Sequence, residues 1–138
     1  MAGNLICSVF RNGSGPGGPS PQCACFMPQY LPMAKPLQAQ SNDATLQALK
    51  ARARVSPTHV KLSGAYRLGD VDSARLARLL LQELGPHSLL WGSDWPCTNH
   101  EQFANFETLI AQAHQWIPSE FFEQIMTENP MRLYWNRF

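Results

Sequence analysis

The sequence has no long apolar run and no excess of charge of either sign. No apolar stretch approaches the roughly 18 residues that a membrane helix requires. Eleven basic and ten acidic residues give a formal net charge of +1 over 138 residues, so we expect neither nucleic acid nor a membrane as partner. The segment from Met1 to Phe10 is too short and too interrupted for a secretory signal. We therefore expect a cytoplasmic protein.

Signatures of several enzyme classes are also missing. The chain has no phosphate-binding loop, no nucleophile elbow and no dinucleotide-binding glycine motif. Among its four cysteines, Cys23 and Cys25 are separated by one residue, which does not match the usual spacings of zinc sites. We interpret the cysteines as reduced thiols.

The first 42 residues differ in composition from the rest of the chain. Residues 11–21 are rich in glycine, proline and serine, and Pro28, Pro32 and Pro36 follow at even spacing. Neither a helical nor a strand period is present, and such composition buries too little apolar surface to offset the entropy of ordering. We predict a disordered leader over residues 1–42. A proline-rich ligand for a partner domain is the alternative, but no PxxP with adjacent basic residues stands out.

From Asp43 onward, apolar residues recur at regular spacing, and we predict one domain over residues 43–138. Asp43 and either Asp70 or Asp72 are suited to cap helices, and Gly85-Pro86 is a strong helix stop. The predicted elements are a helix over 43–54, a strand over 59–63, a helix from about 70 to 84, a strand over 88–91, a helix over about 99–116, and a helix from 118 that breaks at Asn129-Pro130 before one more apolar turn.

The two predicted strands each end next to polar residues. Ser63 and Asp94 mark these ends and are separated by about one strand-plus-crossover unit, so the strands should be parallel neighbours joined by a right-handed crossover. The carboxyl ends of parallel strands are where active sites gather. Asp94 is therefore a candidate metal ligand or proton acceptor; alternatively, its carboxylate closes a turn after the strand.

Three segments together resemble one protein family. They are Val60-Lys61-Leu62-Ser63-Gly64-Ala65-Tyr66-Arg67, Trp91-Gly92-Ser93-Asp94-Trp95-Pro96 and Glu128-Asn129-Pro130-Met131-Arg132-Leu133-Tyr134. In order and spacing they are similar to the C-terminal part of amidohydrolase-related (amidohydrolase 2) proteins, metal-dependent hydrolases with the TIM-barrel fold. Within that family they most resemble the branch that opens the lactone of 2-pyrone-4,6-dicarboxylate. The resemblance covers roughly residues 45–135.

This resemblance implies a fold and a set of roles. The fold is α/β, the C-terminal portion of a (β/α)8 barrel, with strands 59–63 and 88–91 as its last two. Asp94 matches the aspartate that binds the metal or acts as general base toward water. Arg67 matches an arginine that holds a substrate carboxylate, and Tyr66 beside it contacts substrate or packs. The implied substrate is a small carboxylate-bearing lactone or amide, and the implied cofactor of an intact barrel is zinc or manganese.

The chain also departs from the family pattern. Cys97 stands where the family commonly has histidine, and none of the four histidines forms the first-strand His-x-His pair. A complete barrel takes about 250 residues. We therefore expect a C-terminal fragment that binds no metal tightly by itself. Two alternatives to a hydrolase remain: a decarboxylase of the same barrel family, and an inactive fragment that self-associates through its open strand edges.

Three further residues near the predicted strands have candidate roles. Lys61 is interpreted as a polar residue inside the barrel, paired with an acid. His100 could approach Asp94, but a position at the start of a helix is the favoured interpretation. Cys97 could be a soft metal ligand or a reactive thiol, and packing is favoured.

The predicted leader leads to a direct test. Limited proteolysis of the full chain followed by mass spectrometry should remove residues up to about Asp43 and leave the remainder intact, because only the remainder has a period that can build a core. Protection of the leader from the protease would contradict this prediction.

Overall fold

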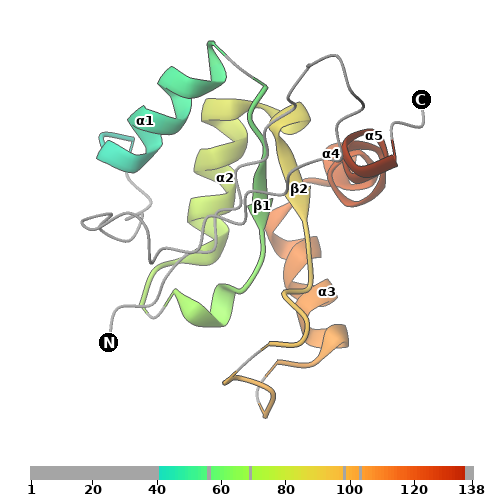
Figure 1. Ribbon diagram of the computed structural model, residues 1–138. Helices are drawn as coiled ribbons and strands as arrows, with labels where there is room; N and C mark the ends of the chain where they lie inside the picture. Colours follow the sequence, from blue (N-terminus) through green and yellow to red (C-terminus); the bar gives the residue numbers. More distant parts are fainter. Residues whose placement is uncertain (1–40, 56, 69, 98, 103, 136–138) are drawn as a thin grey trace.

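A computed structural model describes residues 41–135 except 56, 69, 98 and 103 (Figure 1). Nearly all of the predicted leader lies outside these residues. Two short parallel strands, β1 (Val60–Leu62) and β2 (Leu89–Trp91), lie at the centre. Helices α1 (Ala44–Ala53) and α2 (Ser73–Leu84) cover one side. The segment from α4 (Ser119–Glu123) to α5 (Asn129–Trp135) lies beside β2. None of the helices in the described part of the chain is long and apolar enough to span a membrane.

Helix α1 spans Ala44–Ala53 and begins where the sequence predicts. The Asp43 carboxylate accepts hydrogen bonds from the backbone N–H of Thr45 at 2.8 Å and of Leu46 at 3.3 Å, which satisfies two of the unpaired donors at the helix start. Lys50 forms an ion pair with Glu83 of α2. The cap and the ion pair therefore fix both the start of α1 and its position against the next helix.

The sheet consists of β1 (Val60–Leu62) and β2 (Leu89–Trp91), which pair in parallel with Val60 opposite Leu89. The crossover between them contains the 3-10 turn η2 (Ala65–Arg67), helix α2 (Ser73–Leu84) and the 3-10 turn η3 (Pro86–Ser88). Both strands are shorter than predicted. The prediction of an α/β chain with two adjacent parallel strands is confirmed.

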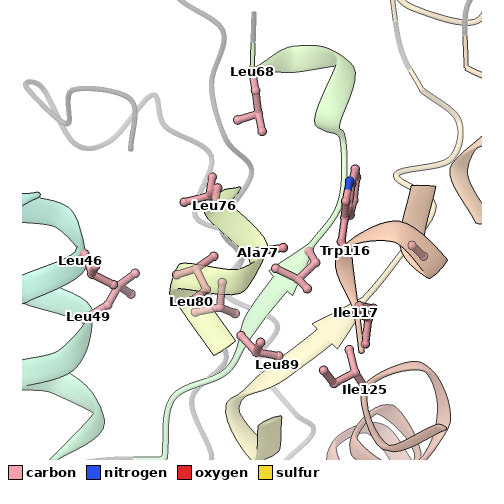
Figure 2. Packing of buried hydrophobic residues seen from close by; sticks show 13 residues of the cluster. Leu46, Leu49, Leu68, Leu76, Ala77, Leu80, Leu89, Trp116, Ile117 and Ile125 are labelled. Atoms are coloured by element: carbon pink, nitrogen blue, oxygen red, sulfur yellow. The ribbon is translucent and has the colours of Figure 1, made fainter. Parts of the chain in front are cut away.

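The hydrophobic core lies between the sheet and the helices (Figure 2). Val60, Leu62 and Leu89 point from the strands into it, and they meet α2, whose buried side chains follow the predicted four-residue spacing. Burying one large aliphatic side chain contributes roughly 1.5–3 kcal/mol. This cluster therefore fixes the register of the strands, and with it the relative position of their ends. Its further members are Leu46, Leu49, Leu68, Leu76, Ala77, Leu80, Ala113, Trp116, Ile117 and Ile125.

Helix α3 spans Phe106–Trp116 and begins about seven residues later than predicted. The Asn105 side chain accepts from the N–H of Thr108 at 2.8 Å and acts as the N-cap. Before it, Asp94, Cys97 and Asn99 all have positive φ values, which a right-handed helix excludes. The prediction of a helix from about residue 99 is therefore wrong, and the chain forms a loop there instead.

The last helical segment is continuous across Pro130, so the predicted break at Asn129-Pro130 is wrong. It consists of α4 (Ser119–Glu123), the π-helical turn η4 (Gln124–Glu128) and α5 (Asn129–Trp135). The N–H of Asn129 bonds to the carbonyl of Gln124, five residues earlier. This shift in hydrogen-bond register comes just before Pro130, which has no N–H to donate, and lets the helix continue.

Asn129 connects this helix to the start of β2. Its side chain is buried, and its Nδ2 donates to the carbonyl oxygens of Pro86 at 2.7 Å and Leu89 at 2.8 Å. Asn129, which the sequence predicted to lie at a helix break, therefore anchors the last helix to the sheet.

Replacing Asn129 tests this anchor. Asn129→Ala should lower the free energy of unfolding by about 1–3 kcal/mol, because it leaves two carbonyl oxygens without their donor. Urea unfolding followed by circular dichroism measures the change. The control is Asn42→Ala at an exposed position, which should stay within about 0.5 kcal/mol of wild type. Equal stability of the two variants would contradict the anchoring role.

Candidate functional site

The loops that leave the two strands meet at the carboxyl end of the sheet. After β1, Gly64 adopts φ 62°, and the chain then turns through η2, which carries Tyr66 and Arg67. After β2, Gly92 and Ser93 lead to Asp94, which also has φ 62°. Aspartate tolerates this left-handed conformation better than most residues other than glycine. Because of these two turns, the loop after β1 and the loop after β2 bend toward each other and do not continue along the strand directions.

These turns bring together all three predicted site residues. The Oδ2 atom of Asp94 accepts a hydrogen bond from the Tyr66 hydroxyl and one from Arg67 Nε, each at 2.8 Å. The Asp94 side chain is 11% exposed and the Arg67 side chain 20% exposed. No donor among the described residues bonds to Oδ1 of Asp94. Both donors thus bond to the same carboxylate oxygen, Oδ2.

Gly64 is a part of the site that the sequence analysis did not single out. A Cβ atom built on Gly64 would lie 3.0 Å from Oδ2 of Asp94, and the positive φ is itself costly for other residues. A side chain at position 64 would therefore push the first loop away from the carboxylate. The signal in the sequence was a glycine directly after a predicted strand and before the candidate residues.

The environment of Tyr66 favours its neutral form. Burial raises the pKa of the Tyr66 hydroxyl, and the neighbouring Cys97 thiol and the charge of Asp94 raise this pKa further. Burial acts to lower the pKa of Arg67, but the hydrogen bond to Asp94 and the charge of Asp94 outweigh it, so the Arg67 pKa is raised. Asp94 thus faces one neutral donor and one positive donor.

Two other loop residues surround this group. The His100 ring lies 4.9 Å from the Tyr66 ring, centroid to centroid. Cys97 is buried, its backbone carbonyl accepts from the N–H of His100 at 2.8 Å, and its Sγ lies 3.8 Å from the carbonyl oxygen of Ser93. The interpretation of His100 as a helix-start residue is wrong, because the structure has a loop there and His100 contacts Tyr66.

The donor set around Asp94 does not fit a metal site. In the described part of the chain no three His, Cys, Asp or Glu side chains come close enough to share an ion, whereas catalytic zinc takes about three protein ligands. The Asp94 oxygen Oδ2 is already paired with a cation, Arg67. These residues by themselves therefore hold a carboxylate beside an arginine, and not a metal.

The sequence profile of the amidohydrolase family matches residues 33–135, about three quarters of the chain. The chain belongs to the amidohydrolase family.

Relatives within the family agree with this assignment. A 2-pyrone-4,6-dicarboxylate hydrolase from Comamonas testosteroni is 34% identical over 73 residues, which cover 51% of this chain and 22% of that protein. A crystal structure from Pseudomonas putida, provisionally named 2-pyrone-4,6-dicarboxylic acid hydrolase, superposes with a TM-score of 0.52 at 25% identity. That match covers 58% of this chain and 32% of the other. The chain thus spans between a fifth and a third of the length of these relatives.

The raised pKa of Tyr66 gives a test of the site geometry. Spectrophotometric titration at 295 nm, with the signal of Tyr66→Phe subtracted, should show Tyr66 ionising above the ordinary tyrosine value of about 10. In Asp94→Asn the midpoint should fall but stay above that value, because the phenolate no longer faces a carboxylate while burial persists. An ordinary midpoint in both proteins would mean that Tyr66 does not contact Asp94.

Proposed function

We propose that this chain forms the last two strand units of a hydrolase barrel that opens a small, carboxylate-bearing cyclic ester or amide with activated water. The observation that carries the proposal is the Asp94 carboxylate, held through one oxygen by Tyr66 and Arg67 at the carboxyl end of two parallel strands. The family match and the names of the two relatives support the reaction class.

Asp94 is the proposed general base. Its fixed Oδ2 sets the direction of the carboxylate, and Oδ1 accepts the proton of a water molecule as that water attacks the substrate carbonyl. The ring C–O or C–N bond then breaks, and the proton on Asp94 is returned to the leaving oxygen or nitrogen. A general base must lie within hydrogen-bond reach of the proton that it accepts, and an oriented carboxylate satisfies this at little entropic cost.

Arg67 and Tyr66 have positioning roles in this proposal. Since Arg67 Nε donates to Asp94, the guanidinium orients the base, in addition to any contact with a substrate carboxylate. The neutral Tyr66 hydroxyl donates to the same oxygen, and the pKa that keeps it protonated is raised by burial and by its neighbours. Both residues thus keep Oδ2 occupied and leave Oδ1 for the water.

The strand topology supports a position for these two strands in the barrel. In a (β/α)8 barrel the catalytic groups lie at the carboxyl ends of parallel strands, on the loops that follow them. Tyr66 and Arg67 follow β1, and Asp94 follows β2. The resemblance and the order of the elements support β1 and β2 as the seventh and eighth strands.

The second candidate is that these residues have no activity without further strands. The sheet in the described part of the chain has two strands, so each strand pairs with the other along one edge only. The second edge of each strand favours pairing with an additional strand. In this case the Asp94 cluster is one side of a site, and association of chains is the expected behaviour.

A graft tests the proposed function. Residues 43–135 would replace the matching segment of the Comamonas hydrolase, and hydrolysis of 2-pyrone-4,6-dicarboxylate would be followed by absorbance. Asp94→Asn should lower kcat by about 10²–10⁴-fold, because it removes the basicity while keeping the shape. The matched control, Asp70→Asn at an exposed position, should leave kcat unchanged. A loss of less than about threefold in Asp94→Asn, well short of the range for a general base, would leave only the turn-closing role for Asp94.

Arg67→Met in the same graft separates two roles of the arginine. Loss of a contact to substrate alone would raise KM with little change in kcat. Because Arg67 also orients the base, we expect kcat to fall together with the rise in KM.

A further inference from the structure

Lys61 lies on the face of β1 that points away from the hydrophobic core. In the strand, Val60 and Leu62 are buried in the core and Lys61 between them is half-buried, as alternation along a strand requires. In the sheet, Lys61 is paired with Leu90. In a closed barrel the face away from the helices is the interior, which is filled by side chains, and substrates are held at its C-terminal end. Lys61 therefore contributes to a substrate site only if its side chain reaches that end.

The Lys61 side chain extends along the sheet toward the end that carries Asp94. A Cβ atom built on Gly92 would lie 2.2 Å from Cε of Lys61 and 3.1 Å from its Nζ. Gly92 follows the last residue of β2, and its N–H donates to the carbonyl of Leu62 at 3.2 Å. The ammonium group therefore lies over Gly92, two residues before Asp94.

The glycine at position 92 is explained by this side chain and not by its own backbone. Gly64 and Gly85 have positive φ values among the described glycines, whereas Gly92 does not. The φ value of Gly92 is not one that favours glycine, and the missing Cβ leaves the room in which the end of the Lys61 side chain lies. Lys61 and Gly92 both stand in the motifs that resemble the family, but the resemblance does not indicate that they lie against each other.

The ammonium group has no acidic partner in the described part of the chain. The ion pairs found there are Lys50–Glu83 and Arg67–Asp94, so the acid expected to pair with Lys61 is not among these residues. An ammonium group without an acidic partner can accept an incoming group of opposite charge as its counter-ion. Arg67, the other cation at this end of the sheet, already donates through Nε to Asp94.

We infer that Lys61, in the space left by Gly92, binds a carboxylate of the substrate and holds it over the sheet end beside Asp94. This inference rests on the proposed function and adds to it a specificity residue, which requires that the substrate carboxylate be placed to reach Nζ. Lys61 is a point-charge donor suited to such a contact. Arg67 then orients the base in addition to any contact with the substrate, and Lys61 holds a substrate carboxylate.

Binding to the full 138-residue chain tests the inference without requiring turnover. Two-dimensional NMR would follow titration with 2-pyrone-4,6-dicarboxylate, and in parallel with its uncharged dimethyl ester at equal ionic strength. We expect the dicarboxylate to shift the Gly92 amide and the Lys61 side-chain signals, and the ester to shift neither. Lys61→Met should raise Kd about tenfold, equivalent to ~1.4 kcal/mol. The control Arg78→Met, which removes one exposed charge on α2, should leave Kd unchanged.

Gly92 provides a second, independent measure. Gly92→Ala should weaken binding as Lys61→Met does, because the methyl group displaces the ammonium. In a Lys61→Ala background, Gly92→Ala should have no further effect, since the clashing side chain is gone. No binding by the wild-type chain, equal Kd values for wild type and Lys61→Met, or additive effects of the two alanine substitutions would each overturn the inference.

The binding test and the graft separate the role of Lys61 in binding from the role of Asp94 as the base. Dicarboxylate binding that depends on Lys61, together with a graft in which Asp94→Asn remains fully active, would uphold the binding site and refute Asp94 as the base. Loss of hydrolysis in Asp94→Asn, together with binding that is indifferent to Lys61, would uphold the base and overturn the role of Lys61.

Discussion

The structure depends most on the contact that joins the ends of its two strands, where Oδ2 of Asp94 accepts from Tyr66 and Arg67. The partners are 28 and 27 residues apart in sequence, so only the fold brings them together. A carboxylate shielded from solvent to this extent requires such partners, because an unpaired charge would destabilise the folded state. The contact thus closes the two loops on each other and fixes the direction of the Asp94 carboxylate, the proposed base.

This contact in turn depends on the packing below it. The core that meets Val60, Leu62 and Leu89 sets the register of β1 against β2, and a slip in register would separate the two loops. Asn129 holds the last helix against the start of β2 through the carbonyl groups of Pro86 and Leu89. Gly64 and Gly92 leave the space in which the carboxylate and the Lys61 ammonium lie. Residues remote from Asp94 therefore determine its geometry.

Much of the fold could be predicted because it rests on local signals. Three local patterns each predict one element directly. Asp43 predicts the start of α1, the leucine spacing predicts α2, and the apolar run before Gly92 predicts β2. The late start of α3 could not be predicted, because nothing in the sequence announces positive φ values at Asp94, Cys97 and Asn99. The continuous last helix was missed because a π turn that accommodates Pro130 has no sequence signature.

For the site, the sequence predicted which residues lie at the strand ends, but it did not predict which side chains contact one another. Strand ends and the resemblance were enough to select Asp94, Arg67 and Tyr66. That Arg67 donates to Asp94, that His100 contacts Tyr66, and that Lys61 lies over Gly92 depend on side-chain directions set by the turns after the strands. The sequence therefore selected candidate residues, and the structure shows which of them lie in contact. Their roles in orienting a base and holding an anion are proposals built on those contacts.

A double-mutant cycle on Arg67 and Asp94 tests this account most directly. Free energies of unfolding would be measured in urea for wild type, Arg67→Met, Asp94→Asn and the double variant, with the exposed Arg52 of α1 and Asp94 as a control pair. The account predicts a coupling of about 0.5–3 kcal/mol for Arg67 with Asp94, the range for residues in direct contact, and none for the control pair. A coupling near zero for Arg67 with Asp94 would show that the strand ends are not joined by this contact, and would contradict the account.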